Sequence, residues 1–292
     1  MFRVSDSFAN RNNSAQVPKT NKSTRRMPDM IIYNRKVDTK TVTAEWLNEL
    51  LTQDPWFKDV VPEFRSLSAS ELPADVDSGT YWKSVCINTA IYLPYLVSQL
   101  LQHGVVLRRA VVAHISQARY LHHTGSLAHV IINCTGIGAA TLGGVADPKV
   151  IPARGQIVLV RNTAPAMYSI SGTDEGDDEA MYIMTRPAGG GTVLGGSYQK
   201  GNWESQVDPN LAIRIMKRCL RYCPELVKPG QGIEGLDVIR HGVGLRPHRI
   251  DGPRLEKDVL REEGQEPLRV VHNYGAGGFG CELLVPFRST RQ

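Results

Sequence analysis

The chain has 292 residues, a net charge of +5, 41% hydrophobic and 22% charged residues. This composition is that of an ordinary globular protein, and it excludes collagen-like, mucin-like and wholly disordered classes. No apolar run approaches the ~20 residues that cross a bilayer, and the N-terminus has no apolar signal region. The five cysteines form no paired framework, which favours a reducing compartment, and we expect a cytoplasmic location without a membrane span.

The basic surplus is concentrated at the start of the chain. Residues 1–40 carry nine basic and three acidic side chains, a surplus of six that leaves the rest near −1. The folded part is therefore not expected to bind nucleic acid. Residues 1–42 are predicted to be a disordered basic tail, and residues 43–292 the folded domain. A transit peptide and a partner-binding tail are the alternatives for the basic segment.

Hydrophobic periodicity and breaker residues predict a mixed α/β (α+β) chain. Residues 54–82 are rich in Pro and Ser and are expected to be a loop with short extended pieces. Helices are expected at residues 43–51, 89–103 and 209–223. Strands are expected at residues 105–108, 110–115, 130–133, 156–160, 181–184, 192–196, 236–240 and 268–273.

Two of these helices have a clear apolar side. In the last helix Asp208 is the expected N-cap, Pro209 takes the first position, and Pro224 ends the helix. The side chains expected to be buried are Leu93, Leu96, Val97, Leu100 and Leu101 in one helix, and Leu211, Ile215, Cys219 and Cys223 in the other.

Two glycine-containing turns follow predicted strands. Residues 275–280 contain four glycines in six positions, directly after the strand at 268–273. Thr135 and Gly136 follow the strand at 130–133. Glycines let the backbone approach a flat or phosphorylated ligand, and ligands bind at the carboxyl ends of strands in α/β sheets. The alternative for each segment is a plain tight turn.

Three polar side chains are candidates for binding a small ligand. Arg246 lies between Leu245 and Pro247, and its guanidinium can bind a carboxylate in bidentate fashion. Tyr182 and Tyr198 can each offer a hydroxyl group. A surface arginine and two half-buried strand tyrosines are the alternatives.

No metal site is expected. The chain has no Cys/His set at zinc spacing, and the acidic run at 174–179 lacks the regular ligand spacing of a calcium loop. This run is expected to be a solvated loop.

Six segments, taken in order, resemble the FAD-dependent D-amino-acid oxidases, especially the fungal ones. They are SVCINTAIYLPYL (84–96), VIINCTGIGA (130–139), ARGQIVLV (153–160), LGGSYQKGNW (194–203), VGLRPHR (243–249) and VVHNYGAGGFG (270–280). The resemblance covers residues 43–280 and implies oxidation of a D-amino acid to an imino acid, with hydride transfer to FAD and release of hydrogen peroxide by reaction with molecular oxygen.

The resemblance also implies roles for individual residues. Arg246 would bind the substrate carboxylate, Tyr182 would help to hold it, and Tyr198 would be a second active-site tyrosine. No side chain is expected to act as acid or base, because a neutral amine lets the hydride leave directly. The residues expected against FAD are Val112, Thr135, Gly136, Arg246, Gly277, Gly278 and Gly280.

The implied architecture has two parts. Residues 153–240 would form mainly the antiparallel sheet of the substrate domain. Residues 105–152 and 241–292 would form the residual part of an FAD-binding domain of the glutathione-reductase-like type.

The sequence departs from the family at both ends. Residues 1–42 contain no glycine, so the family's G-x-G-x-x-G turn is absent, and Cys281 to Pro286 differ from the family continuation. We therefore expect a chain truncated at both ends, with weak or no FAD binding. The alternative to an active oxidase is a non-catalytic remnant that cannot retain FAD. An exposed sheet edge is expected to favour dimerisation or aggregation. The family is often peroxisomal, and this chain ends without a peroxisomal signal.

Overall fold

The computed structural model describes residues 25–41, 52 and 54–280, and the helix expected at 43–51 lies outside them. The chain divides into two compact units. Unit 1 comprises residues 1–97, 155–198 and 206–243, and unit 2 comprises residues 98–154, 199–205 and 244–292. Within the described residues no helix is long and apolar enough to span a membrane.

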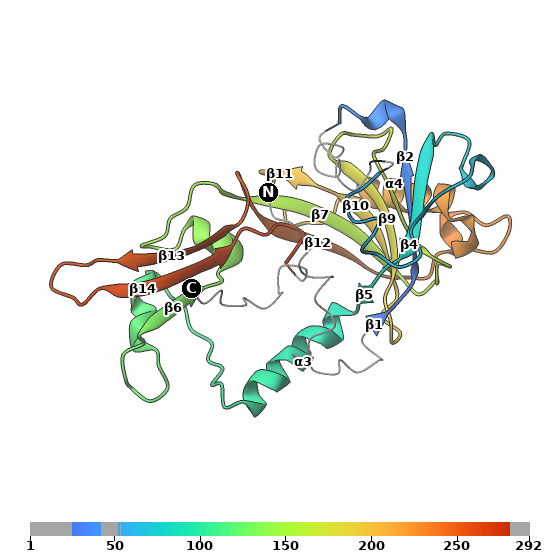
Figure 1. The fold of residues 1–292 in the computed structure, drawn as a ribbon. Helices are drawn as coiled ribbons and strands as arrows, with labels where there is room; N and C mark the ends of the chain where they lie inside the picture. Colours follow the sequence, from blue (N-terminus) through green and yellow to red (C-terminus); the bar gives the residue numbers. More distant parts are fainter. Residues whose placement is uncertain (1–24, 42–51, 53, 281–292) are drawn as a thin grey trace. The chain divides into compact units, whose positions relative to one another are not determined.

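Unit 1 is built around an antiparallel-rich sheet (Figure 1). β2 pairs antiparallel with β4 and parallel with β8, and β8, β9, β10 and β7 follow in antiparallel order. The elements of unit 1 are β1 (Arg25–Arg26), β2 (Asp29–Asn34), β3 (Arg65–Ser66), β4 (Ser78–Lys83), β5 (Cys86–Ile87), β8 (Met167–Ile170), β9 (Glu179–Thr185), β10 (Thr192–Ser197) and α4 (Pro209–Tyr222). Three elements have residues in both units, namely α3 (Thr89–Gln102), β7 (Val150–Val160) and β12 (Val238–Arg249).

Unit 2 contains a smaller sheet in the order β13-β14-β6. β13 and β14 form an antiparallel pair, and β6 pairs parallel with β14 (Figure 1). The elements of unit 2 are β6 (Val130–Asn133), β11 (Gln199–Lys200), β13 (Arg254–Leu260) and β14 (Leu268–Tyr274), with short 3-10 turns at Ile115–Tyr120 and Gly136–Ala140. The predicted mixed α/β class is confirmed.

Helix α4 starts and packs as its sequence predicts. Asp208 Oδ1 accepts hydrogen bonds from the N–H groups of Asn210 and Leu211, and Pro209 occupies the first helical position. The buried Gln156 side chain donates to the Asp208 carbonyl and accepts from its N–H, so the helix start is tied to β7. Leu211, Ile215, Cys219 and Cys223 are all buried, as predicted.

Burial decides the chemistry of the two cysteines on this helix. It raises the pKa of the Cys219 and Cys223 thiols to about 12. Both thiols therefore stay protonated at neutral pH, and they pack in the apolar core of unit 1 rather than act as nucleophiles.

The prediction of a disordered segment over residues 1–42 is wrong for residues 29–34, which form β2. Met30, Ile32 and Tyr33 of this strand are buried in the two apolar clusters of unit 1. An apolar run of this length outweighs the basic composition around it, because burying each large side chain contributes about 1.5–3 kcal/mol.

Three further expectations need correction. The helix at 89–103 is confirmed as α3, but none of its described side chains is buried. No strand forms over residues 105–115, where the described part of the chain has only an isolated bridge between His114 and Gly143, and Val111 is 99% exposed. The acidic run is only partly solvated, since the carboxylate of Glu179 is buried and paired with Arg214 and Arg218.

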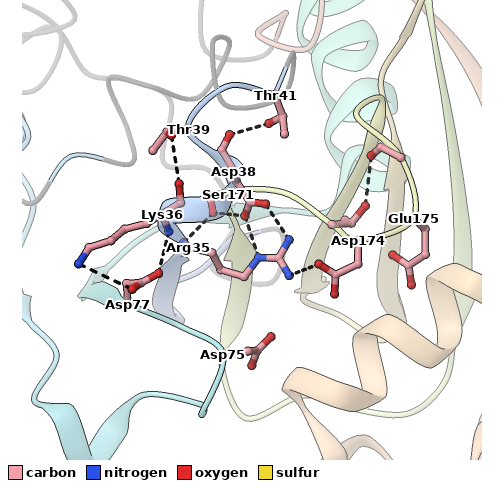
Figure 2. Close-up of polar contacts among 12 residues, drawn as sticks. Arg35, Lys36, Asp38, Thr39, Thr41, Asp75, Asp77, Ser171, Asp174 and Glu175 are labelled. Carbon is pink, nitrogen blue, oxygen red and sulfur yellow. Dashed lines mark hydrogen bonds and ion pairs between the residues drawn. The ribbon is translucent and has the colours of Figure 1, made fainter.

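A buried ion pair fixes the chain directly after β2 (Figure 2). Arg35 donates from Nε and Nη2 to the two carboxylate oxygens of Asp38, at 2.8 and 2.7 Å, and both side chains are buried. Arg35 Nη1 also donates to Asp174, and the hydroxyl of Ser171 donates to Asp38. Gly172 leaves room for the Asp38 carboxylate, because a Cβ atom at residue 172 would lie 2.6 Å from the carboxyl carbon.

The Asp38→Ala substitution should therefore destabilise unit 1 strongly. Removal of Asp38 leaves the buried Nε and Nη2 of Arg35 without their acceptors, although Nη1 keeps Asp174, and it should lower the free energy of unfolding by about 3 kcal/mol. Urea denaturation followed by circular dichroism measures this change. The control is Lys36→Ala, because Lys36 Nζ is exposed and 3.8 Å from Asp77, and it should change stability by less than about 0.5 kcal/mol. If both variants lost the same free energy of unfolding, the stabilising role of the Arg35–Asp38 pair would be contradicted.

Candidate functional site

The candidate site in unit 2 lies where two parallel strands end. In the β6–β14 pair, His272 is opposite Asn133, so the carboxyl ends of the two strands are adjacent. The Thr135–Gly136 turn follows β6, and the glycine run at 275–280 follows β14. The strand pairing therefore places the two turns predicted from the sequence at the same end of one sheet.

Pro247 of β12 is hydrogen-bonded to one turn and lies beside the other. Its carbonyl accepts a hydrogen bond from the N–H of Gly277 at 2.8 Å. A Cβ atom on Gly136 would lie 3.7 Å from two carbons of the Pro247 ring. Gly136 and Gly277 both have φ of +58°, a conformation that glycine adopts without strain. Three segments that are distant in sequence thus converge on one proline.

The backbone around this point suits a large polar ligand. No side chain caps the 3-10 turn that Thr135 precedes. Among the described residues, a Cβ atom on Gly280 would meet nothing within 4 Å, so these residues leave the backbone there open to close approach. Backbone N–H groups in glycine-rich turns bind phosphate and carbonyl oxygens of cofactors, and these turns fit such a group.

Arg246 lies near the two glycine turns of unit 2, because it is the residue before Pro247 in the chain. It is half-buried in β12 and directly precedes Pro247. The nearby Arg249 has a separate structural role, because its Nε donates to the buried carboxylate of Asp147 at 2.8 Å. This carboxylate also accepts the hydroxyl of Tyr274, and Arg249 lowers the pKa of Asp147 against the opposing effect of burial.

Val112 is not brought to the glycine turns by any contact of the described residues. It is partly buried and packs against the small apolar cluster of Ile115, Leu142, Leu268 and Val270. Gly278 lies in the same turn as Gly277.

Tyr182 lies in unit 1, on the sheet face opposite α4. Its neighbours Met181 and Ile183 point into the core cluster that includes α4, so alternation along β9 places Tyr182 on the other face. In the strand register Tyr182 is opposite Ser169 on β8 and Gly195 on β10.

Because Gly195 has no side chain, the Tyr182 ring can pack against the backbone at this position. A Cβ atom on Gly195 would lie 2.0 Å from the ring carbon Cζ, and one on Gly196 would lie 2.9 Å from the Tyr182 hydroxyl. The ring therefore rests directly on the backbone of β10. Tyr198 follows this strand, is buried, and donates its N–H to the Asp178 carbonyl at 2.6 Å.

The sequence and the fold of this chain are similar to those of known proteins. The pattern of the family described as "FAD dependent oxidoreductase" matches residues 30–284. The chain belongs to this family of FAD-dependent oxidoreductases. The match includes the two glycine turns, Arg246 and both tyrosines.

Curated relatives support the assignment. The chain is 48% identical over 252 residues to a protein named D-amino-acid oxidase from Fusarium vanettenii, covering 86% of this chain and 68% of the relative. It is 36% identical over 222 residues to one of the same name from Schizosaccharomyces pombe, with 76% and 61% coverage. A protein named D-aspartate oxidase from Talaromyces thermophilus is 32% identical over 221 residues, with 76% and 55% coverage. The chain thus spans between about half and two thirds of the length of these relatives.

The solved structure of glycine oxidase from Geobacillus kaustophilus has a similar fold. The TM-score is 0.59 at 17% identity, and the match covers 87% of this chain and 66% of that chain. This similarity supports the fold of the FAD-dependent oxidoreductase family in the present chain.

Sequence reasoning missed Gly195, which lies against Tyr182 in unit 1, and it missed Pro247, Asn133 and His272 around the turns of unit 2. Only the tertiary structure shows that Pro247 lies beside both turns. The sequence held one signal for Asn133, because this residue directly precedes the Cys-Thr-Gly segment at the strand end. The functional roles of Arg246, Tyr182 and Tyr198 stay predictions.

Substitution of Gly195 by Ala should displace the Tyr182 ring. The added methyl group overlaps the ring, and overpacking of this kind lowers the free energy of unfolding by about 1–3 kcal/mol. Thermal unfolding and the near-ultraviolet circular dichroism of the tyrosines measure the two effects.

The matched control is Gly244→Ala, since Gly244 is also a strand glycine and a Cβ atom there meets nothing within 4 Å. We expect this variant to change stability little and to leave the tyrosine signal intact. If Gly195→Ala behaves in the same way, the tight contact with Tyr182 is wrong.

Proposed function

We propose that this protein oxidises D-amino acids to imino acids, using FAD and molecular oxygen and releasing hydrogen peroxide. The observation that carries the proposal is the position of Pro247, which is hydrogen-bonded to Gly277 and lies beside Gly136. Arg246, the candidate carboxylate-binding residue, is therefore held one residue from the backbone that would bind the flavin. The curated relatives named D-amino-acid oxidase support the same chemistry.

The residues expected to hold FAD are those of unit 2. Thr135, Gly136, Gly277, Gly278 and Gly280 would offer backbone atoms to the cofactor, and Arg246 and Val112 would lie close to it. When bound, FAD supplies the acceptor for the hydride of the substrate α-carbon.

The chain's own residues would bind and orient the substrate. Arg246 would hold the α-carboxylate through a bidentate contact, which fixes the direction of the Cα–H bond. As the family resemblance implies, Tyr182 and Tyr198 of unit 1 are proposed as further substrate-binding residues through their hydroxyl groups. These roles require no proton transfer to a side chain, because the amine is bound in its neutral form.

The substrate is proposed to have a neutral side chain. Arg249 is paired with Asp147, and burial together with Lys200 lowers the pKa of His248. Neither residue therefore provides a second cation for an acidic side chain at neutral pH. D-alanine is accordingly the first substrate to test.

Self-association is a separate proposal. In the described part of the chain no strand pairs with the outer edge of β6, and Val130 and Ile132 of this strand are exposed. Exposed edges and apolar side chains favour pairing with a second chain. A homodimer or larger aggregate and a cytoplasmic location stay predictions.

The decisive experiment is an FAD titration of the purified protein, followed by a peroxide assay with D-alanine. We expect saturable quenching of flavin fluorescence and peroxide production. Arg246→Ala should lower kcat/KM about 10²-fold or more, because two charge-assisted hydrogen bonds are each worth about 1.5–3 kcal/mol.

Arg269→Ala is the control, since Arg269 is an exposed arginine on β14. It should leave kcat/KM unchanged. Absence of FAD binding in a folded protein would contradict the proposal and favour a non-catalytic remnant of the family. If Arg246→Ala and Arg269→Ala had equal activity, only the proposed role of Arg246 would be contradicted, and the proposed reaction would stand.

A further inference from the structure

Two buried polar side chains connect β6 and β14 directly beneath the Thr135–Gly136 turn. Asn133 and His272 are opposite one another in the strand register, and their exposed fractions are 2% and 3%. Asn133 Nδ2 lies 3.1 Å from His272 Nδ1. Asn133 Oδ1 accepts hydrogen bonds from the N–H of Thr135 at 3.2 Å and from its hydroxyl at 2.8 Å. One amide group therefore serves both the turn and the imidazole.

The hydrogen bonds determine the protonation of the imidazole. The backbone N–H of Thr135 can only donate, so the oxygen of the Asn133 amide must face the turn. The NH₂ group then faces His272 and can only donate, so Nδ1 must accept with its lone pair. His272 is therefore neutral in this arrangement, and its proton is on Nε2, which lies 3.5 Å from Asp258 Oδ2.

A second proton on His272 would create a conflict. Nδ1–H and the Asn133 NH₂ group would then both be donors facing one another. The bond would break, or the amide would rotate and present its oxygen to His272. Rotation would take the acceptor away from Thr135. Protonated His272 and the ordered turn thus compete for the same oxygen atom.

The charged groups around His272 come mainly from β13. Asp258 and Glu256 favour the imidazolium form, whereas Arg254 and burial oppose it. Tyr274 of the same strand contacts the ring edge-to-face, and β6 contributes the uncharged Asn133. Burial is the largest effect, and the pKa of His272 is lowered from its usual 6.5. The stability that neutral His272 contributes to the folded protein is therefore fully present above pH 6.5, and it is lost as the pH falls below that value.

We propose that Asn133 and His272 form a proton-controlled positioning pair that holds the Thr135–Gly136 turn in its ligand-binding conformation. Neutral His272 keeps the Asn133 oxygen on the turn, and protonated His272 releases it. The inference rests on the proposed function for one point only, that the ligand of the turn is the flavin. The effect on the turn itself is a property of the protein without a ligand.

The first test uses the protein without added FAD. Hydrogen exchange of a peptide covering residues 130–140 is measured between pH 8 and pH 5 and corrected for the intrinsic pH dependence. We expect protection to fall about tenfold at low pH, and ¹⁵N spectra of the imidazole at pH 8 to show the proton on Nε2.

Two variants separate positioning from simple structural damage. His272→Asn places an amide oxygen near the position of Nδ1, so it should keep the bond to Asn133 and make the protection independent of pH. His272→Leu removes the acceptor and should lower the protection at every pH. His122→Gln, an exposed histidine of unit 2, should behave as the unsubstituted protein.

The second test measures the dissociation constant of FAD over the same pH range. We expect it to rise about tenfold from pH 8 to pH 5 in the unsubstituted protein and to stay constant in His272→Asn. A pH-dependent FAD affinity in His272→Asn equal to that of the unsubstituted protein, or a proton on Nδ1 at pH 8, would overturn the positioning pair.

Failure of the proposed function and failure of the positioning pair would give different results. If FAD binds at no pH but the exchange behaves as expected, the proposed function fails and the positioning pair stands. If FAD binds and supports peroxide formation while exchange and affinity are independent of pH, the pair fails and the function stands.

Discussion

The parallel pairing of β6 with β14 is the constraint on which the candidate site depends. Parallel strands end on the same side, so the pairing sets the Thr135–Gly136 turn beside the glycine run that follows Tyr274. Two glycine turns far apart in the sequence then lie beside one proline of β12. A slip of β14 against β6 by one residue would turn His272 to the face opposite Asn133 and separate the amide from the imidazole.

Close packing determines the geometry of unit 1 in a comparable way. The Tyr182 ring rests on Gly195, and the Asp38 carboxylate rests on Gly172, so in both cases a missing Cβ atom makes room for a polar side chain. Arg35 binds both oxygens of Asp38, and this pair fixes the chain where β2 ends. Substitution at either glycine therefore acts on a polar or charged side chain rather than on the apolar core.

The proposed binding of FAD at the two turns would account for the buried polar side chains near the ends of β6 and β14. A cofactor bound by backbone atoms needs turns of defined conformation, and those turns need buried partners that hold them. Asn133 supplies the oxygen that holds Thr135, and His272 determines the orientation of that oxygen. The chemistry then belongs to the cofactor and the bound substrate, and the protein contributes positions and charges.

The sequence by itself determined the features that depend on neighbouring residues. The Asp208 cap, Pro209 and the four-residue apolar spacing determine α4 locally, and the order of six motifs identifies the family. Outside α4, only the tertiary structure decided which of these segments are buried and what they contact. It buried β2 despite its basic surroundings, left the apolar side of α3 without buried residues, and paired Glu179 with two arginines. It also joined Asn133 to His272 across 139 residues. Local periodicity carries no information on such contacts, because they arise from the pairing of strands that are distant in the chain.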